Sequence, residues 1–486
     1  MQRSGIYSRA EIAVEKKIHH LGKRFYFSHD GDCLWTATLP IMDCQVVPMI
    51  STRRQFLRGA LTGAAVLPFV AKTLASGLPL SHSELELSDS ALLDELERAS
   101  FEFFWNEANP QSGLVLDRAN ANGGSARRKA SIAATGFGLT ALCIGADHGY
   151  RPKAEIERRV AQTLAFLVHH APAEHGFLYH FVDENTGQRF GNSEISPIDM
   201  AILLCGALTC REYFHSGEIR RDVTALYERV EWPWMLNGGD TFALCWTPER
   251  AFSHLRWDAY CESMMMYLLA MGSPTAPIPT ECWHAIRRPK MVYRGHQYVS
   301  SPAPLFVHQF SHAWFDFRGR HDDYANYFEN SVLACRAHRE FCEELSRKFP
   351  CYSGDIWGIT ASDSSLGYVA WGGPPLLGPI DGSIVPAAAA GSLPFMFSES
   401  VAVLRKLRGQ YGKQIWEKYG FVDAFNPLTG WTSKDVLGID VGISMLMAEN
   451  ARSQFVWNTF MRNDEPMLAM ERAGFLPDGF EVPMMA

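Results

Sequence analysis

The chain has 486 residues, 47% of them hydrophobic and 20% charged, and carries a net charge of −8 at pH 7. These values are typical of a globular protein with a large core, and they exclude a disordered or fibrous chain. The acidic balance and the absence of a block rich in lysine and arginine provide no general attraction to nucleic acid or anionic lipid. We therefore expect neither as a partner.

The segment over residues 49–75 has the parts of an export signal. Arg53 and Arg54 lie just before a Phe-Leu pair, and a short apolar stretch over residues 59–71 leads to small residues where cleavage is expected. The pattern is typical of a twin-arginine signal peptide. Because the apolar stretch is too short to span a bilayer comfortably, we favour cleavage over a retained membrane anchor. The sequence therefore predicts an exported protein, periplasmic or secreted, that is not inserted in the membrane after cleavage.

Residues 1–48 stand ahead of this signal, whereas a twin-arginine peptide normally has only a short tail before its arginines. Met49 lies four residues before Arg53. We interpret Met49 as the true start, and residues 1–48 as a mis-assigned upstream segment or a disordered leader. Residues 76–87 are predicted to form a linker.

From residue 88 to residue 486 the chain reads as one helical domain. The spacing of apolar residues indicates about a dozen helices of ordinary length. The clearest lie at residues 91–108, 135–149, 155–170, 198–214, 257–273, 324–345, 398–412, 441–460 and 465–475. Segments rich in glycine and proline, at residues 354–368 and 371–386, interrupt the helices.

These helices are of two kinds, and the difference predicts the architecture. Some are amphipathic, whereas others are apolar nearly all round and must be buried. Alternating exposed and buried helices over almost 400 residues predict an all-α fold, an α/α barrel in which an inner ring is surrounded by an outer one. A helical solenoid would show a shorter and more regular sequence repeat, which this chain lacks.

Acidic residues stand at the start of three helices that are apolar all round: Glu194 with Asp199, Asp258 with Glu262, and Asp440. Acids at a helix N-terminus often act only as caps. Pro197 fits the first helical turn after Ser196, which makes Asp199 either the acid of a capping box or a site residue. Glu194 lies ahead of the helix, so capping does not explain it. Asp440 stands between two glycines, which fits either an N-cap in a tight turn or the close approach of a ligand.

Glu262 is harder to explain as a cap. Asp258 occupies the capping place, so Glu262 is predicted about one turn inside the helix, near Met264 and Tyr267. Burial there would raise its pKa, and a carboxyl that stays protonated near neutral pH can serve as a general acid. If the buried helices start at the same end of a barrel, their acids converge. Two carboxyls across a cleft are the minimal equipment for glycoside hydrolysis.

Three other residue types have competing explanations. Loop tryptophans either stack on sugar rings or cover the core: Trp246, Trp257, Trp314, Trp357, Trp371 and Trp431. His308 and His312 are four residues apart, but no HExxH glutamate accompanies them, so we expect no metal site and no cofactor. Of the eleven cysteines, nine lie beyond the leader, and this odd number indicates buried thiols rather than a closed disulfide framework.

A set of motifs in fixed order gives the chain a family resemblance. They are TGFGLTAL, EWPWM, WDAYCES followed by LLAMGSP, HQFSHAWFDFRG, YANYFENS, GDIWGITASD, GFVDAFNP, GWTSKDVLGIDVG and AENAR. Together they resemble the bacterial glucoamylase-like family assigned to glycoside hydrolase family 144, over about residues 88–475. The resemblance implies an (α/α)6 barrel (toroid) and cofactor-free endo-hydrolysis of linear β-1,2-glucan to sophoro-oligosaccharides, with inversion. Some members are exo-acting and release sophorose.

The resemblance also implies roles for individual residues. Glu262 matches the general acid, Glu194 matches an acid of the same cleft, and Asp440 is our choice for the base that activates water, directly or through a substrate hydroxyl. The expected substrate-binding residues are Asp117, Arg118, Asp199, Trp257, His312, Trp357, Thr360, Asp363 and Trp431.

The chain departs from the commoner family pattern at two motifs. AENAR stands where IENYR is expected, and VGIS stands where QGPI is expected. These changes leave Asp440 in place but leave subsite shape, exact substrate and product length open. The alternatives are transglycosylation or hydrolysis of another β-glucan, a lyase, which the acidic balance disfavours, and a glycan-binding protein without catalysis. The oligomeric state cannot be read from the sequence.

Overall fold

The computed structural model describes residues 88–301, 304–375 and 378–479. The predicted upstream segment, signal peptide and linker lie outside these residues. From Asp89 onward the described chain belongs to one compact unit. Within the described ranges, no helix combines the length and the apolar character needed to cross a membrane.

Helices account for most of the regular structure, as the sequence predicts. The longer ones are α2 (Asp89–Asn106), α3 (Ile132–Asp147), α4 (Lys153–His169), α5 (Pro197–Phe214), α6 (Gly217–Glu228), α8 (Met264–Gly272), α10 (Tyr327–Leu345), α12 (Phe397–Ile415), α13 (Gly438–Arg452) and α15 (Asp464–Arg472). The shorter ones are α7 (Trp232–Leu236), α9 (Glu281–Ala285), α11 (Pro386–Ala390), α14 (Phe455–Phe460) and the 3-10 helices η1 (Leu305–His308) and η2 (Ser311–Ala313). The predicted helix at 441–460 is divided in two, because Gln454 adopts a left-handed backbone conformation between α13 and α14.

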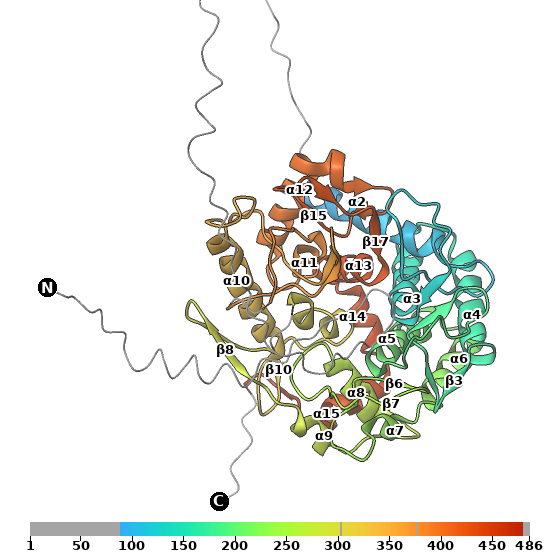
Figure 1. Cartoon of the computed structure of the whole chain (residues 1–486). Helices are drawn as coiled ribbons and strands as arrows, with labels where there is room; N and C mark the ends of the chain where they lie inside the picture. The colour runs from blue at the N-terminus through green and yellow to red at the C-terminus, as the bar shows by residue number, and fades with distance from the viewer. Residues whose placement is uncertain (1–87, 302–303, 376–377, 480–486) are drawn as a thin grey trace, which may run out of the picture. The chain divides into compact units, whose positions relative to one another are not determined.

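The two kinds of helix expected from the sequence are both present. Helices α8 and α11 are buried along their whole length, and nearly every residue of α3, α5 and α13 is buried. Helices α4, α6, α10 and α12 bury only one face. Figure 1 shows α4 and α6 outside α3 and α5, and α2 and α12 outside α11 and α13. This arrangement follows from the sequence, because a helix without a polar face is stable only when other helices surround it.

Glycine brings two of the buried helices unusually close together. Helix α3 packs most extensively against α5. A Cβ atom on Gly136 would lie 2.4 Å from the carbonyl oxygen of Ile202, and one on Gly206 would lie 2.0 Å from the carbonyl oxygen of Gly136. These distances are too short for any side chain, so glycine at both positions permits backbone contact between the helices.

The strands are short and form two-stranded antiparallel ladders, mostly in the loops that join the helices. They are β1 (Arg118–Asn120), β2 (Lys129–Ser131), β3 (Ala173–Glu174), β4 (Phe177–Leu178), β5 (Phe181–Asp183), β6 (Trp246–Thr247), β7 (Ala251–Phe252), β8 (Lys290–Tyr293), β9 (His296–Val299), β10 (Arg320–His321), β11 (Ser362–Ser364), β12 (Gly367–Val369), β13 (Trp416–Glu417), β14 (Gly420–Phe421), β15 (Phe425–Asn426), β16 (Trp431–Thr432), β17 (Asp435–Leu437) and β18 (Leu476–Pro477).

Two of these ladders matter for the site, because each holds a loop at the start of a buried helix. Strand β1 pairs with β17, with Arg118 opposite Leu437, the residue just before α13. Strand β2 pairs with β5 and leads directly into α3, whose first turn is capped by the Ser131 hydroxyl. The ladders therefore hold segments that are distant in sequence at the same ends of α3 and α13.

The cysteines behave as buried thiols. Every described cysteine is free, and all but Cys351 are buried. The expectation that these residues serve as small hydrophobes is confirmed within the described part of the chain.

Candidate active site

A histidine joins two of the predicted acids ahead of helix α5. Nδ1 of His180 lies 2.8 Å from Oε1 of Glu194, and Nε2 of the same ring lies 3.4 Å from Oδ1 of Asp199. Burial alone would lower the pKa of His180, but Asp199 and Glu194 together raise it to about 9. The ring is therefore a cation at neutral pH, held between two carboxylates.

These contacts decide between the two interpretations of Asp199. The Ser196 side chain makes no capping hydrogen bond to α5, so the predicted capping box does not form. Burial raises the pKa of Asp199, whereas His180 counteracts this. Burial also acts to raise the pKa of Glu194, but the hydrogen bond to His180 outweighs it and the pKa is lowered. Both carboxyls thus belong to a buried polar site.

Arg118 forms a second charged bridge, beside strand β17. Its Nε lies 3.1 Å from Oδ2 of Asp117, and its Nη1 lies 2.8 Å from Oδ1 and 3.0 Å from Oδ2 of Asp363. Lys129 approaches Asp117 from the other side, with Nζ 3.4 Å from Oδ2. Although burial acts to raise the pKa of Asp117, Arg118 and Lys129 hold it below its ordinary value. Asp117 is therefore ionised, and its orientation is fixed by two cations.

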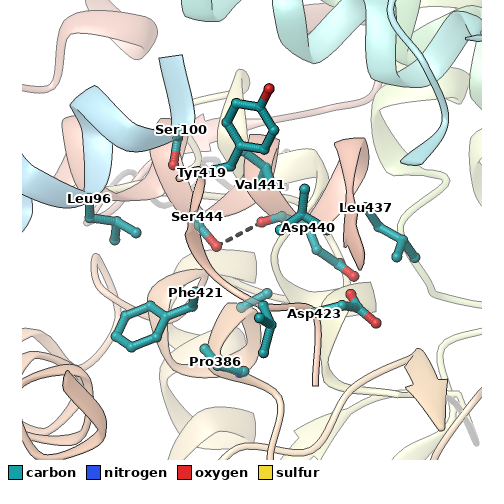
Figure 2. A pocket seen from close by; sticks show the side chains of 13 residues that line it. Leu96, Ser100, Pro386, Tyr419, Phe421, Asp423, Leu437, Asp440, Val441 and Ser444 are labelled. Carbon is teal, nitrogen blue, oxygen red and sulfur yellow. Dashed lines mark hydrogen bonds between the residues drawn. The ribbon is translucent and has the colours of Figure 1, made fainter. Parts of the chain in front are cut away.

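Asp440 shares its surroundings with a second aspartate, Asp423. Figure 2 shows both among the side chains that line one cavity, with their carboxyl groups close together. The backbone amide of Asp363 donates to Oδ2 of Asp423 over 2.6 Å. Oδ1 of Asp423 and Oδ2 of Asp440 are buried, and among the described residues no amide, hydroxyl or cationic group donates to them.

Two buried carboxyls this close cannot both be ionised without a large cost. Burial and the neighbouring Asp440 hold the pKa of Asp423 well above its usual range. Burial raises the pKa of Asp440 to about 6, although a hydrogen bond from Asp423 acts to lower it. Asp423 therefore carries the proton of the pair, and Asp440 is the carboxyl that ionises near neutral pH.

Glu262 lies in the turn just before helix α8, which begins at Met264. The prediction that it stands one turn inside the helix is wrong, and so is the placement of Asp258 as the cap. Asp258 is half exposed and pairs with Arg287, whose Nη2 lies 2.9 Å from its Oδ1. The Ser311 hydroxyl donates to the backbone oxygen of Glu262 over 2.7 Å and holds this turn in place.

The expected electrostatic state of Glu262 is nevertheless present. Burial raises its pKa to about 7, and the charge of Asp199 adds to this effect. Glu262 is therefore protonated in a large fraction of molecules at neutral pH.

Charge interactions connect these groups into one site. Besides burial, Asp199 raises the pKa of Glu262, and Asp117 raises the pKa of both Asp199 and Asp440. Such mutual effects require short separations in a poorly solvated region. Glu194 and Glu262 precede α5 and α8, and Asp440 lies in the first turn of α13. The charges of Asp117 and Asp199 connect the surroundings of Glu262 with those of Asp440.

Part of the chain is similar to proteins of known sequence and structure. Residues 254–464 match the family model described as a putative glucoamylase. Over 437 residues, the chain is 30% identical to an exo β-1,2-glucooligosaccharide sophorohydrolase (non-reducing end) from Parabacteroides distasonis. Over residues 254–464, the chain is thus similar to the glucoamylase-like family. The match covers 81% of this chain and 59% of the relative, so the chain spans less than two thirds of that protein.

Solved structures of similar proteins have the same fold. A putative glucoamylase from Bacteroides uniformis superposes with a TM-score of 0.76 at 28% identity, covering 81% of this chain and 98% of the other. An endo-β-1,2-glucanase from Chitinophaga pinensis, in complex with sophorotriose and glucose, gives a TM-score of 0.75 at 28% identity, covering 80% and 99%. The resemblance noted in the sequence is therefore confirmed.

Three residues expected to bind sugar lie in the core of this glucoamylase-like protein instead. His312 is fully buried, its Nε2 lies 3.1 Å from the Ser331 hydroxyl, and burial lowers its pKa to about 3. Trp357 is fully buried as well, and the hydroxyl of buried Thr360 accepts a hydrogen bond from the backbone amide of Phe306. The prediction of direct sugar contact is wrong for these side chains, because solvent does not reach them.

The remaining predicted binding residues are accessible to different degrees. Trp257 and Trp431 are half buried, and the indole nitrogen of Trp257 donates to the backbone oxygen of Leu244 over 3.3 Å. Asp363 is largely buried and is held by Arg118. The part of these two tryptophans in sugar binding stays a prediction.

Sequence reasoning missed three members of the site. Asp423 lies within the motif GFVDAFNP. It does not stand at the start of a helix, which was the pattern that selected the other acids. Tyr368 stands opposite Asp363 in the β11–β12 hairpin, and burial raises its pKa together with the charges of Asp440 and Asp423. His180 follows a short strand and has no sequence signature at all.

Proposed function

We propose that this protein hydrolyses linear β-1,2-glucan with inversion, using Glu262 as general acid and Asp440 as general base. One observation carries the proposal. The site holds a carboxyl with a pKa near 7, Glu262, and a second, Asp440, that ionises near pH 6. A carboxyl that keeps its proton near neutral pH and a second that gives its proton up are what acid and base catalysis by two carboxyls requires.

The relatives support the substrate class. The Parabacteroides distasonis protein is named for cleaving β-1,2-glucooligosaccharides, and the Chitinophaga pinensis structure is named as an endo-β-1,2-glucanase. One name describes exo action and the other describes endo action. We infer endo action for this chain. The lengths of the oligosaccharides that it releases from linear β-1,2-glucan test this: a range of lengths indicates endo action, and sophorose alone indicates exo action.

We infer that the architecture is an (α/α)6 barrel, because the buried elements form a closed series of contacts. Helix α3 packs on α5, α5 on α8, α11 on α13, and α13 on α3. The 3-10 segment fills the remaining place: Met265 of α8 donates to the Ser311 hydroxyl over 3.1 Å, and Gln309 donates to Ala388 of α11 over 2.9 Å. Six inner elements follow, and the acids lie at the starts of α5, α8 and α13.

The acid step requires a proton on Glu262. In the inverting mechanism, this carboxyl protonates the glycosidic oxygen as the bond to the anomeric carbon breaks. Its location in a buried turn, with Asp199 nearby, keeps the proton in place near neutral pH. Loss of the proton to the leaving group produces a carboxylate that the surrounding acids destabilise, so the proton is readily regained.

The base step requires an ionised Asp440. It accepts a proton from the attacking water, directly or through a substrate hydroxyl, on the opposite face of the sugar. Asp423 aids this role, because it stays protonated and donates a hydrogen bond to Asp440. The pair therefore carries one negative charge and not two. Inverting enzymes typically separate their carboxyls by roughly 6.5–9.5 Å to leave room for the water.

We infer that the charged bridges bind and orient the substrate. Asp117, Asp363 and Arg118 present fixed donors and acceptors beside Asp440, whereas Glu194 and Asp199 do so beside Glu262. Polar groups that are already oriented lose little entropy when they bind sugar hydroxyls. Export through the twin-arginine signal at residues 49–75 would place the enzyme in the periplasm or outside the cell.

The proposed activity predicts a selective substrate profile. Release of reducing ends by the purified protein should be rapid on linear β-1,2-glucan and at least about 10²-fold slower on laminarin and on a soluble cellulose derivative, because each subsite is shaped for one linkage. Equal rates on these polymers would contradict the linkage. Redistribution of chain lengths without new reducing ends would indicate a transglycosylase, and binding without turnover would indicate a glycan-binding protein.

A further inference from the structure

A second cluster of polar side chains lies away from the acidic site. The cluster consists of Glu97 of α2, His148 at the C-terminus of α3 and Glu449 near the C-terminus of α13, and each offers one possible ligand atom. These atoms lie within 4.8 Å of one another. Because the acidic site lies at the N-terminal ends of α3 and α13, this cluster is at the opposite ends of the same helices.

Glu97 is the most unusual member of the cluster. Its side chain is fully buried, and Oε2 accepts a hydrogen bond from Nη1 of Arg452 over 2.5 Å. Oε1 is also buried but has no hydrogen-bond partner. A buried carboxyl oxygen without a partner is costly, so this position favours a ligand that could supply one.

The other two members are already oriented toward each other. Nε2 of His148 lies 2.8 Å from Oε2 of Glu449, and the Ser453 hydroxyl donates to the second carboxylate oxygen of Glu449. The backbone amide of His148 caps α3 through the carbonyl oxygen of Ile144, which fixes the position of the ring. The imidazole is one quarter exposed, so solvent and small ions reach the cluster from this side.

We propose that Glu97, His148 and Glu449 form a binding site for one divalent transition-metal ion of the zinc type. One imidazole nitrogen and two carboxylate oxygens are a donor set that Zn²⁺ accepts, with water as the fourth ligand on the exposed side of His148. Ca²⁺ and Mg²⁺ prefer oxygen donors alone, so the histidine disfavours them.

The surroundings of the cluster match those of a metal site. Arg452 and Ser453 each hold a carboxylate oxygen of one ligand, as hydrogen-bond donors around metal-binding carboxylates commonly do. An ion would also supply the missing partner for Oε1 of Glu97. Since the three ligands come from α2, α3 and α13, the bound ion would clamp three helices together. This inference does not depend on the proposed glucanase activity.

The test is Zn²⁺ binding by the full-length protein after dialysis against a chelator. Competition with a fluorescent Zn²⁺ indicator should give one site per chain, with three protein ligands and water completing the coordination. His148→Ala and Glu97→Gln should each weaken this binding at least about 10-fold, because each removes a ligand. His170→Ala is the matched control, since His170 is an exposed histidine at the C-terminus of α4.

Each outcome supports or overturns the inference. Stoichiometric Zn²⁺ binding that is weakened in both variants and unchanged in His170→Ala supports it, as does a rise in melting temperature on adding Zn²⁺ that His148→Ala abolishes. Absence of binding by the wild type, or equal binding by His148→Ala, overturns it. Equal affinity for Ca²⁺ or Mg²⁺ overturns the assigned class of ion. If Glu97→Gln does not fold, His148→Ala decides alone, because its side chain is partly exposed at a helix end.

Discussion

We expect Glu262→Gln to lower kcat/KM on linear β-1,2-glucan by about 10²- to 10⁴-fold, the usual contribution of a general acid. Glutamine has nearly the same shape but cannot give up a proton to the glycosidic oxygen. Because glutamine fills the same space and the backbone oxygen of Glu262 is already held by Ser311, the substitution should leave the fold intact. Circular dichroism and the melting temperature should therefore match the wild type.

The matched control for this variant is Asp258→Asn. Asp258 lies four residues earlier in the same segment, but its side chain is half exposed and pairs only with Arg287. A surface ion pair of this kind contributes little, so activity should stay within about 2-fold of the wild type. Equal losses in the two variants would remove Glu262 from the mechanism and indicate a general effect on the turn before α8.

The pH profile gives the same prediction an independent readout. The acid must be protonated, so activity is present below the pKa of Glu262 and is lost as the pH rises through about 7. The residual activity of Glu262→Gln should lack this alkaline limb. A mutant that retained the limb would show that another group supplies the proton.

The second large effect is expected at Asp440. Asp440→Asn should lower kcat/KM by about 10²- to 10⁴-fold, because the amide cannot accept a proton from water. The base must be ionised, so wild-type activity is lost as the pH falls through about 6. Steady-state kinetics from pH 4 to pH 9 on linear β-1,2-glucan measures both effects.

Asp423→Asn separates the two members of the carboxyl pair. Asp423 holds the proton of the pair, and a neutral carboxamide still donates a hydrogen bond to Asp440, so the loss should be no more than about 10-fold. Asp464→Asn controls for removal of an acid from the first turn of a helix, because Asp464 is exposed at the start of α15. If Asp423→Asn were as inactive as Asp440→Asn, Asp423 would have to be considered the base.

The helical character of the chain could be predicted because it depends on local patterns. Segments such as residues 198–214 have no polar face, and the structure buries them as α5. The same reasoning selected the acids at helix starts, and the pKa values of Glu194, Glu262 and Asp440 are all shifted by their surroundings. That the three act in one catalytic site stays a prediction. The position of Glu262 relative to its helix was predicted less well. It was expected one turn inside the helix, but α8 begins two residues after it, because the hydroxyl of distant Ser311 holds the turn at that point.

The parts of the site that could not be predicted depend on contacts between distant segments. Arg118 reaches Asp363 across 245 positions, and the β1–β17 ladder that places it joins segments more than 300 residues apart. His180 acquires its role only from folding against Glu194 and Asp199. A family motif also does not distinguish contact with substrate from support of the core, which is why His312 and Thr360 were assigned to the wrong environment.

The central claim is that two carboxyls of this glucoamylase-like protein cleave β-1,2-glucan with inversion. Proton NMR of the anomeric signals during the first minutes of hydrolysis of linear β-1,2-glucan tests it most directly. The account predicts that new reducing ends appear first as the α-anomer and then mutarotate. Reducing ends that appear first as the β-anomer would contradict the assignment of Glu262 and Asp440 as acid and base, because retention requires a covalent intermediate on one of the carboxyls.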